Sequence, residues 1–298
     1  MPSNTFWPWR DGVGAIEYNN RLIMLGGWND DAAFAPYITT DEIWQSIDSG
    51  VTWTLVGSAP WSKRHSFSYC LMNEYIYVWG GDNIYGQLKD IWRFSDSVGW
   101  EQVTSDWGTT GGNRLLQAGC AHKGELYMAG GQESYSAPTN NFTNIVKWNG
   151  ATWTSVGTLP ISYFSTGVML SDGVSLFIIG GGQYLNTGHV NLNNDVYKSE
   201  DDGATWTNVG SLSNGMTGVM YCGAALFNNK IFYINGYSPT APIGNTQGVW
   251  WAKREVDYWV KVGNNDLTHA MGISNPVDDH FYIVSGNDKK SVWKIEMA

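Results

Sequence analysis

The sequence predicts an all-β fold, a single six-bladed β-propeller of four-stranded antiparallel blades, and three observations support this. An apolar run followed by two small residues recurs six times, and the first small residue falls at positions 26, 80, 130, 180, 235 and 285. The steps of 54, 50, 50, 55 and 50 residues form a regular period that indicates a repeat architecture. The composition, with 17 Trp, 36 Gly and only 15% charged residues, is typical of many short strands. The third observation is the strand pattern inside each repeat.

Each repeat contains four strand-like runs, which we name strands a to d. In the second repeat they are HSFSYCLM (65–72), YIYVWGG (75–81), DIWRFS (90–95) and GWEQV (99–103). Their β-branched and aromatic residues suit a pleated, half-buried surface. The glycines after strand b permit positive φ angles or a close approach of backbones. One such sheet cannot bury both of its faces, whereas six sheets stacked radially can.

The period, the Gly-Gly after strand b and the Trp further along resemble kelch repeats over nearly the whole chain. The resemblance implies one kelch-like propeller domain over residues 1–298. The expected blades span 10–57, 64–104, 114–157, 164–210, 218–263 and 269–298, the last completed by residues 3–7.

The ring is expected to close through its two ends. The run SVWKIEMA (291–298) aligns with strand c of the sixth blade, which leaves that blade without a strand d. We predict that residues 3–7 supply this outer strand by pairing with residues 291–297, which would remove two open sheet edges. Pro8 marks the end of the predicted strand because it cannot donate to a ladder.

Charge and cysteine content exclude several classes of function. The net charge of −10 and the pI near 4.8 argue against nucleic acid as the partner, because that binding rests on neutralising phosphates. Cys70, Cys120 and Cys222 are too few for a disulfide framework and are expected to be buried thiols. The five His are scattered, so no metal and no cofactor is predicted. No signal peptide and no membrane-spanning apolar run is visible, which favours a virion or cytoplasmic location over classical secretion.

One short motif occurs twice, as SIDSGVTW (46–53) and SEDDGATW (199–206). It resembles the Asp-box of sialidases, which in those enzymes stands away from the catalytic pocket. In both copies it falls between strands c and d, where the aspartate can accept backbone N–H groups and the glycine relieves strain. We interpret it as a structural turn formed by Ser46, Asp48, Gly50, Thr52 and Trp53 in one copy, and by Ser199, Asp201, Gly203, Thr205 and Trp206 in the other.

The loops between strands b and c lie on the opposite face, and four of the six exceed ten residues. They are rich in Tyr, Asn, Ser, Thr and Gly, as binding loops on rigid scaffolds are. The predicted stacking residues are Trp28, Tyr37, Tyr85, Tyr135, Tyr184 and Tyr237. The alternative is that these loops are only soluble connectors.

Basic residues recur in one register on that face. Counting back sixteen residues from the first small residue of each repeat gives Arg10, Arg64, Arg114, Phe164, Val219 and His269. The basic members would form a positive arc that binds a carboxylate. Kelch domains that bind acidic peptides and a kelch-type sialic-acid mutarotase both carry basic residues in this part of the face. The alternative is structural, with each guanidinium bound to a backbone carbonyl of the neighbouring blade.

The leading hypothesis is therefore a non-enzymatic recognition propeller that binds a surface glycan or an extended protein partner on this loop face. The composition would suit a virion or tail-fibre adhesin. The competing hypothesis is an enzyme that acts on acidic sugars, a mutarotase or a sialidase-like protein. A third hypothesis is an intracellular kelch adaptor. No membrane insertion is expected, and the oligomeric state is left open.

Overall fold

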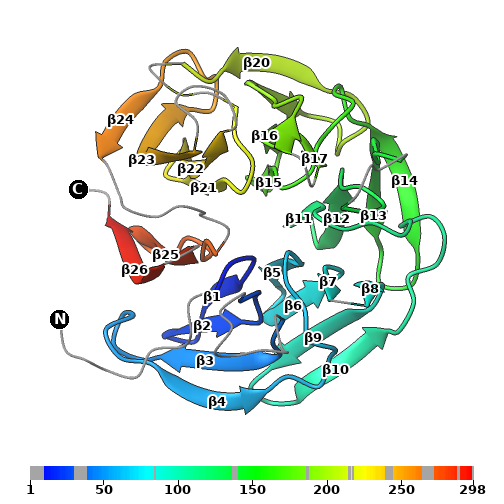
Figure 1. Cartoon of the computed structure of the whole chain (residues 1–298), viewed down its shortest axis with the longest axis vertical. Helices are drawn as coiled ribbons and strands as arrows, with labels where there is room; N and C mark the ends of the chain where they lie inside the picture. The colour runs from blue at the N-terminus through cyan, green and yellow to red at the C-terminus, as the bar shows by residue number, and fades with distance from the viewer. Residues whose placement is uncertain are drawn as a thin grey trace.

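The computed structural model describes residues 10–29, 39–83, 85–135, 140–185, 188–213, 216, 218–238, 244–263, 272–286 and 289–296. Every regular element in these residues is a β-strand, and the larger sheets stand around a common axis (Figure 1). No helix in this described part of the chain is long and apolar enough to cross a membrane.

Five sheets have four antiparallel strands each, in the order that the repeats predict. Blade 1 holds β1 (Gly14–Tyr18), β2 (Arg21–Leu25), β3 (Glu42–Ser46) and β4 (Thr54–Ser58). Blade 2 holds β5 (Ser68–Met72), β6 (Tyr75–Trp79), β9 (Ile91–Ser95) and β10 (Gly99–Thr104). Blade 3 holds β11 (Ala118–His122), β12 (Glu125–Ala129), β13 (Asn144–Trp148) and β14 (Trp153–Thr158). Blade 4 holds β15 (Val168–Ser171), β16 (Leu176–Ile179), β19 (Asp195–Ser199) and β20 (Thr207–Ser211). Blade 5 holds β21 (Gly223–Phe227), β22 (Lys230–Ser238), β23 (Gly244–Lys253) and β24 (Val260–Gly263).

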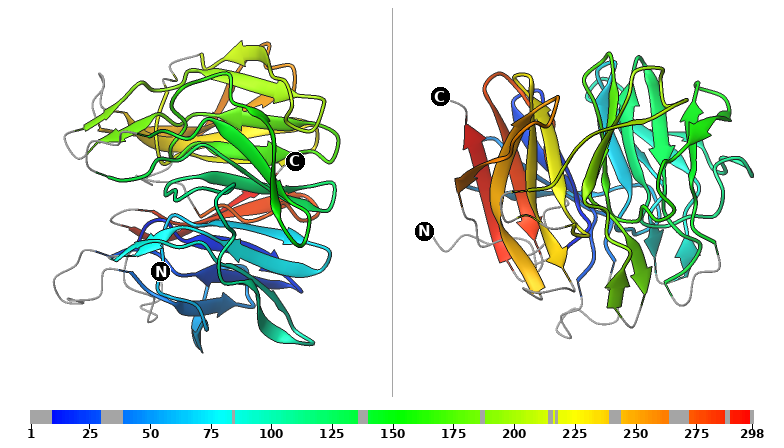
Figure 2. Two further views of the ribbon diagram at one scale, coloured as in Figure 1. Left: turned by 90° about the vertical axis from the view of Figure 1, so that its right-hand side faces the viewer. Right: turned by 90° about the horizontal axis from the view of Figure 1, so that it is seen from above.

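Three smaller two-stranded sheets complete the described structure. Two are excursions of the loops between the second and third strands: β7 (Asp82–Asn83) with β8 (Gly86–Gln87), and β17 (Gln183–Leu185) with β18 (Gly188–Val190). The third is the hairpin of β25 (His280–Gly286) and β26 (Lys289–Glu296), which lies between blade 5 and blade 1 (Figures 1 and 2).

The prediction of six four-stranded blades is wrong, because the structure is a propeller with five four-stranded blades and this hairpin. The sixth apolar run does form a strand, β25, and it pairs with β26 as strands b and c were expected to pair. Of the residues before β25, the structure describes those from 272 on, and there isolated bridges from Ile273 and Val277 to β25 stand in place of a regular first strand. Pro276 stands between them and has no N–H to donate, which prevents a regular ladder there. The predicted outer strand at residues 3–7 lies outside the described residues.

The hydrophobic cores lie between neighbouring sheets, because alternate residues of a strand point to opposite faces. The hairpin shows this most clearly. Phe281 and Ile283 of β25 pack against blade 5, whereas Tyr282 and Val284 pack against blade 1. A two-stranded sheet therefore has two apolar faces to bury and fills the space between its neighbours. The first strand of each blade is innermost and faces the axis (Figure 1).

Candidate functional site

The predicted arginine arc is buried within the blades. Arg10, Arg64 and Arg114 are 2%, 0% and 0% exposed. Each donates through Nη1 to the carbonyl of the glycine sixteen residues later, at 3.1, 3.0 and 3.0 Å. That glycine belongs to the same blade, whereas the sequence had suggested a neighbouring blade.

Each guanidinium also donates to a polar side chain at the start of the third strand. Arg64 is bidentate with Asp90, with both distances 2.8 Å, and Arg10 reaches Glu42 at 2.7 Å. Arg114 instead meets the neutral amide oxygen of Asn144 at 2.8 Å. Burial without a counter-charge lowers the pKa of Arg114 to about 9.

These contacts favour the structural alternative for the arginines over a ligand-binding arc. Their donors already bind acceptors inside the blade, and their side chains are enclosed. Blade 4 has Phe164 in this register, and there Asn193 Nδ2 binds the Gly180 carbonyl at 3.2 Å instead. His269 of the same register lies outside the described residues.

The residue after the arginine register stands three positions before the first, innermost strand of its blade (Figure 1), and we call this end of the channel its mouth. In each of the five blades it forms an isolated bridge with the residue that follows the Gly-Gly position. The five bridges are Asp11–Trp28, His65–Asp82, Leu115–Gln132, Ser165–Gly182 and Met220–Tyr237. The backbone geometry of the bridge is repeated while its side chains differ from blade to blade, as expected where a repeated scaffold presents varied chemistry.

A hydrogen-bonded cluster joins blades 2 and 3 at this mouth. Tyr135 donates its hydroxyl to Asp82 Oδ1 at 2.8 Å, and His65 Nδ1 lies 3.5 Å from the same oxygen. The Asp82 side chain is 3% exposed, and this burial raises the pKa of its carboxyl despite the neighbouring His65 and Tyr135. The Tyr135 hydroxyl also lies 3.4 Å from His65 Nε2.

Gln132 holds the next blade in place. Its amide oxygen accepts from Ser165 Oγ at 2.9 Å and from the Tyr184 backbone N–H at 3.0 Å, while its Nε2 donates to the Tyr184 carbonyl at 3.0 Å. These three bonds fix the start of the β17–β18 hairpin relative to blade 3. The ring of Tyr184 is thereby positioned by rigid neighbours.

Aromatic and imidazole rings form a continuous series across the mouth. The ring centroids are 6.3 Å apart for Trp28 and His65, and 6.5 Å apart for His65 and Tyr135. Tyr135 and Tyr184 follow at 5.2 Å, and Tyr184 and His189 at 4.7 Å. We call the whole series the aromatic arc; its members are Trp28, His65, Tyr135, Tyr184, His189, Tyr221 and Tyr237.

The electrostatics of the mouth are acidic. Burial is the main cause that raises the pKa of Tyr184 and of Tyr221, and the carboxylates of Asp11 and Asp82 add to both shifts. Asp11 belongs to blade 1, whereas the two tyrosines belong to blades 4 and 5. Groups from opposite sides of the ring therefore face a common space.

Of the aromatic residues predicted from the sequence, Trp28, Tyr135, Tyr184 and Tyr237 belong to the arc. Tyr85 follows β7 in the turn to β8 and is 90% exposed, so it is not part of this series. Tyr37 lies outside the described residues. Sequence reasoning missed Asp11, His65, Asp82, Gln132, His189 and Tyr221. The repeat carried a signal for four of them, because Asp11 and His65 directly follow the arginine register and Asp82 and Gln132 directly follow a Gly-Gly.

The comparisons with known proteins agree with this architecture. The solved structure of YjhT superposes with a TM-score of 0.74, covering 97% of this chain and 94% of that chain at 12% identity. The fold is that of a β-propeller. An identity this low shows the fold alone.

The sequence comparison adds a kelch relative. The kelch repeat protein M-T8 of Myxoma virus is 27% identical over 170 residues, which are 51% of this chain and 30% of that protein. The match thus spans less than a third of the viral protein's length. No protein-family model matches the chain. The structural similarity to YjhT and the sequence similarity to M-T8 together support a propeller of kelch-like repeats.

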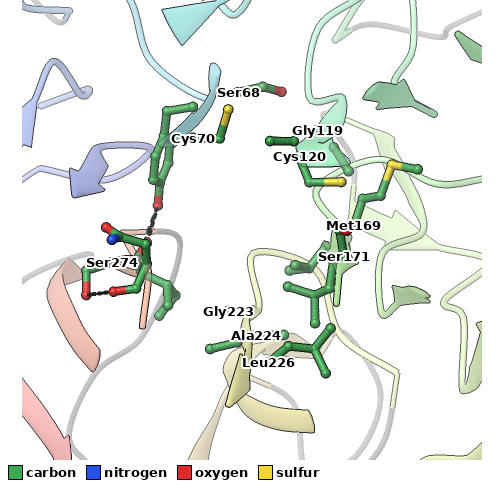
Figure 3. Close-up of a pocket in the computed structure, with 18 of the residues that line it drawn as sticks. Ser68, Cys70, Gly119, Cys120, Met169, Ser171, Gly223, Ala224, Leu226 and Ser274 are labelled. Carbon is green, nitrogen blue, oxygen red and sulfur yellow. Dashed lines mark hydrogen bonds between the residues drawn. The ribbon is translucent and has the colours of Figure 1, made fainter. Parts of the chain in front are cut away.

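The axis of the propeller contains a cavity of about 290 Å³ below the mouth. It is lined by the innermost strands and by residues 273–276, and Figure 3 shows Cys70, Cys120 and Met169 in its wall. Burial raises the pKa of Cys120 to about 12, and it also raises that of Cys70. The described residues contain no group of three or more His, Cys, Asp or Glu that could hold a metal ion.

The two Asp-box-like turns lie between the third and fourth strands, away from the aromatic arc. Asp48 accepts from the Thr52 N–H at 2.8 Å and from its hydroxyl at 2.5 Å, and Asp201 accepts from Thr205 at 2.8 and 2.6 Å. Ser46 and Ser199 each accept the glycine N–H at 2.8 Å. Trp53 and Trp206 then donate to the carbonyls of Gly50 and Gly203 at 3.1 and 3.2 Å.

The Asp201 turn makes stability depend on pH. Hydrogen bonds from the Thr205 side chain and backbone lower the pKa of Asp201 from 3.8 to about 2. A carboxyl whose pKa is depressed by folding stabilises the protein above its unfolded pKa. That contribution is lost as the pH falls from about 4 to about 2.

We therefore expect Asp201→Ala to lower the melting temperature at pH 7, with a difference from wild type that shrinks toward pH 2. Thermal denaturation followed by circular dichroism at several pH values measures this. Ligand binding should persist in the folded variant. Loss of binding at an unchanged melting temperature would instead give the turn a functional role.

Proposed function

We propose that this protein is a recognition propeller that binds a neutral glycan at the aromatic arc. The observation that carries the proposal is the convergence of rings from all five blades on one mouth, with Tyr135 and Asp82 hydrogen-bonded between them. Aromatic faces supply apolar area at low entropic cost, and the adjoining hydroxyl, imidazole and carboxylate groups supply directional bonds. A sugar ring presents the matching combination of C–H faces and hydroxyl groups.

The charges at the mouth support a neutral sugar more than an acidic one. Asp11 and Asp82 bring negative charge, and the three arginines that would have anchored an acid are enclosed by their own blades. An incoming carboxylate would be repelled without gaining a guanidinium partner. The same argument weighs against a sialidase-like enzyme or a mutarotase acting on acidic sugars.

A protein partner is the second candidate, and the observation that favours it is the similarity to a viral kelch repeat protein. Tyr-rich loops on a rigid ring also suit an extended peptide. The virion or tail-fibre setting stays a prediction.

A glycan array probed with purified protein tests the proposal. Tyr184→Ala should weaken binding of a neutral glycan about tenfold or more, as removal of a central aromatic anchor does. Tyr85→Ala is the matched control, because Tyr85 is exposed outside the arc, and its affinity should equal that of the wild type.

Two results would count against this function. One is binding of acidic glycans alone, and the other is an equal loss in both tyrosine variants. Capture of a peptide ligand without any glycan would favour the second candidate.

A further inference from the structure

A second cluster of polar side chains lies away from the aromatic arc, on the face of the turns that follow the first strands. Ser171 ends β15 in blade 4, His122 ends β11 in blade 3, and Asp202 lies in the turn between β19 and β20. Ser171 Oγ is 2.7 Å from His122 Nδ1, and His122 Nε2 is 2.9 Å from Asp202 Oδ1. The three side chains thus form an unbroken serine, histidine and carboxylate chain.

The directions of these hydrogen bonds follow from the chemistry of the groups. An ionised carboxylate only accepts, so His122 Nε2–H donates a hydrogen bond to Asp202. In the neutral ring, Nδ1 is then an acceptor, and the Ser171 hydroxyl donates to it. Relative to the serine hydrolase triad, in which Nε2 faces the serine and Nδ1 the aspartate, the two ring nitrogens are exchanged. The histidine still bridges a serine hydroxyl and a carboxylate, so Nδ1 is placed to draw the proton from the hydroxyl.

Asp202 and His122 are both held in position. Hydrogen bonds from Lys123 and from His122 lower the pKa of Asp202, so the carboxylate remains ionised. The His122 side chain is fully buried, with its ring 5.4 Å from that of Tyr127. The Gly173 N–H donates to Ser171 Oγ at 3.0 Å and occupies a second site on that oxygen.

The serine also lies where a small molecule can reach it. Ser171 lines the channel cavity, together with Met169 and Leu226 (Figure 3). The cavity of about 290 Å³ has the size of a small ligand site and a mainly apolar wall. β15 is the edge strand of its sheet on the channel side, so its channel-facing N–H groups are free of ladder bonds. Such groups can stabilise an oxyanion.

We propose that Ser171 is a nucleophile that hydrolyses esters of short apolar carboxylic acids. In this reaction the ester acylates the Ser171 hydroxyl. Ser171 Oγ attacks the ester carbonyl while His122 Nδ1 takes the hydroxyl proton. The carbon–oxygen bond to the alcohol then breaks, and His122 returns the proton to the departing alkoxide. Water, deprotonated by His122, then attacks the acyl carbonyl. The bond to Ser171 Oγ breaks, His122 returns the proton to that oxygen, and the acid is released. Asp202 is a positioning residue that holds the imidazole tautomer.

The cluster also joins blades 3 and 4, so the test has to separate reactivity from stability. Treatment of the wild-type protein with a fluorophosphonate probe, followed by peptide mass spectrometry, needs no variant. The expected result is a covalent adduct on Ser171 and hydrolysis of p-nitrophenyl butyrate.

Three variants complete the experiment. Ser171→Ala should abolish both the adduct and the hydrolysis. Asp202→Asn, at a side chain that is 46% exposed, should leave the melting temperature close to wild type. It should slow labelling at least about tenfold and move the pH midpoint of the labelling rate. Ser68→Ala is the control, because Ser68 lines the same cavity without a histidine partner and should change neither readout.

An unlabelled wild-type protein would overturn the proposal, as would an adduct on another residue or hydrolysis that persists in Ser171→Ala. A loss of melting temperature in Ser171→Ala, with no reactivity in the wild type, would leave the cluster a purely structural link between blades.

Discussion

Replacing Arg64 by alanine is expected to lower the free energy of unfolding by about 3–5 kcal/mol, the range for breaking a buried ion pair. The guanidinium is fully buried and satisfies both Asp90 carboxylate oxygens and the Gly80 carbonyl. Its removal leaves Asp90, which is 9% exposed, as a buried charge that keeps the hydrogen bond from Trp92 Nε1 but loses its counter-charge. Urea denaturation at pH 7 measures the loss.

Two further variants test this cause. Adding Asp90→Asn to Arg64→Ala should recover part of the loss, because an amide is cheaper to bury than an unpaired carboxylate. Arg93→Ala is the surface control: Arg93 pairs with Glu101, but the two side chains are 37% and 38% exposed. It should cost about 1 kcal/mol or less. Equal losses in Arg64→Ala and Arg93→Ala would contradict the assigned role.

The repeat period predicted the strands well because it reports local alternation of apolar residues. The apolar run that recurs is the second strand of each unit. A two-stranded hairpin is enough to produce such a run. This is why the run at 279–286 was counted as a sixth four-stranded blade although the structure has a two-stranded sheet there. The number of strands that join a sheet depends on contacts between distant segments, which the period does not encode.

The candidate site was predicted only in part, for a related reason. Counting residues located the arginine register. The role of each arginine depends on whether its side chain is buried, and that depends on the neighbouring loops. Glu42 and Asp90 were visible in the sequence at the start of the third strands, where they neutralise Arg10 and Arg64. The tyrosines of long loops were recognised by composition. His65 and Asp82 belong to short connections and carried no compositional signal.

A methyl group at Gly130 should be among the most damaging small changes in the chain. Gly130 has φ of +68°, and a Cβ there would lie 2.1 Å from the Phe164 carbonyl oxygen of the next blade. The neighbouring Gly131 N–H donates to that same oxygen at 2.9 Å. Gly130→Ala should therefore combine backbone strain with a steric clash and lower the free energy of unfolding by about 3 kcal/mol or more.

Gly124→Ala separates the two causes. Gly124 also has a positive φ, +80°, but a Cβ there meets nothing within 4 Å. This variant should show the strain alone, about 1 kcal/mol, because only the left-handed backbone penalises the side chain. The difference between the two variants in urea denaturation then measures how closely blades 3 and 4 must approach at the Gly-Gly. If both variants lost the same stability, blade 4 would be moving aside, and close contact at Gly130 would not hold the ring together.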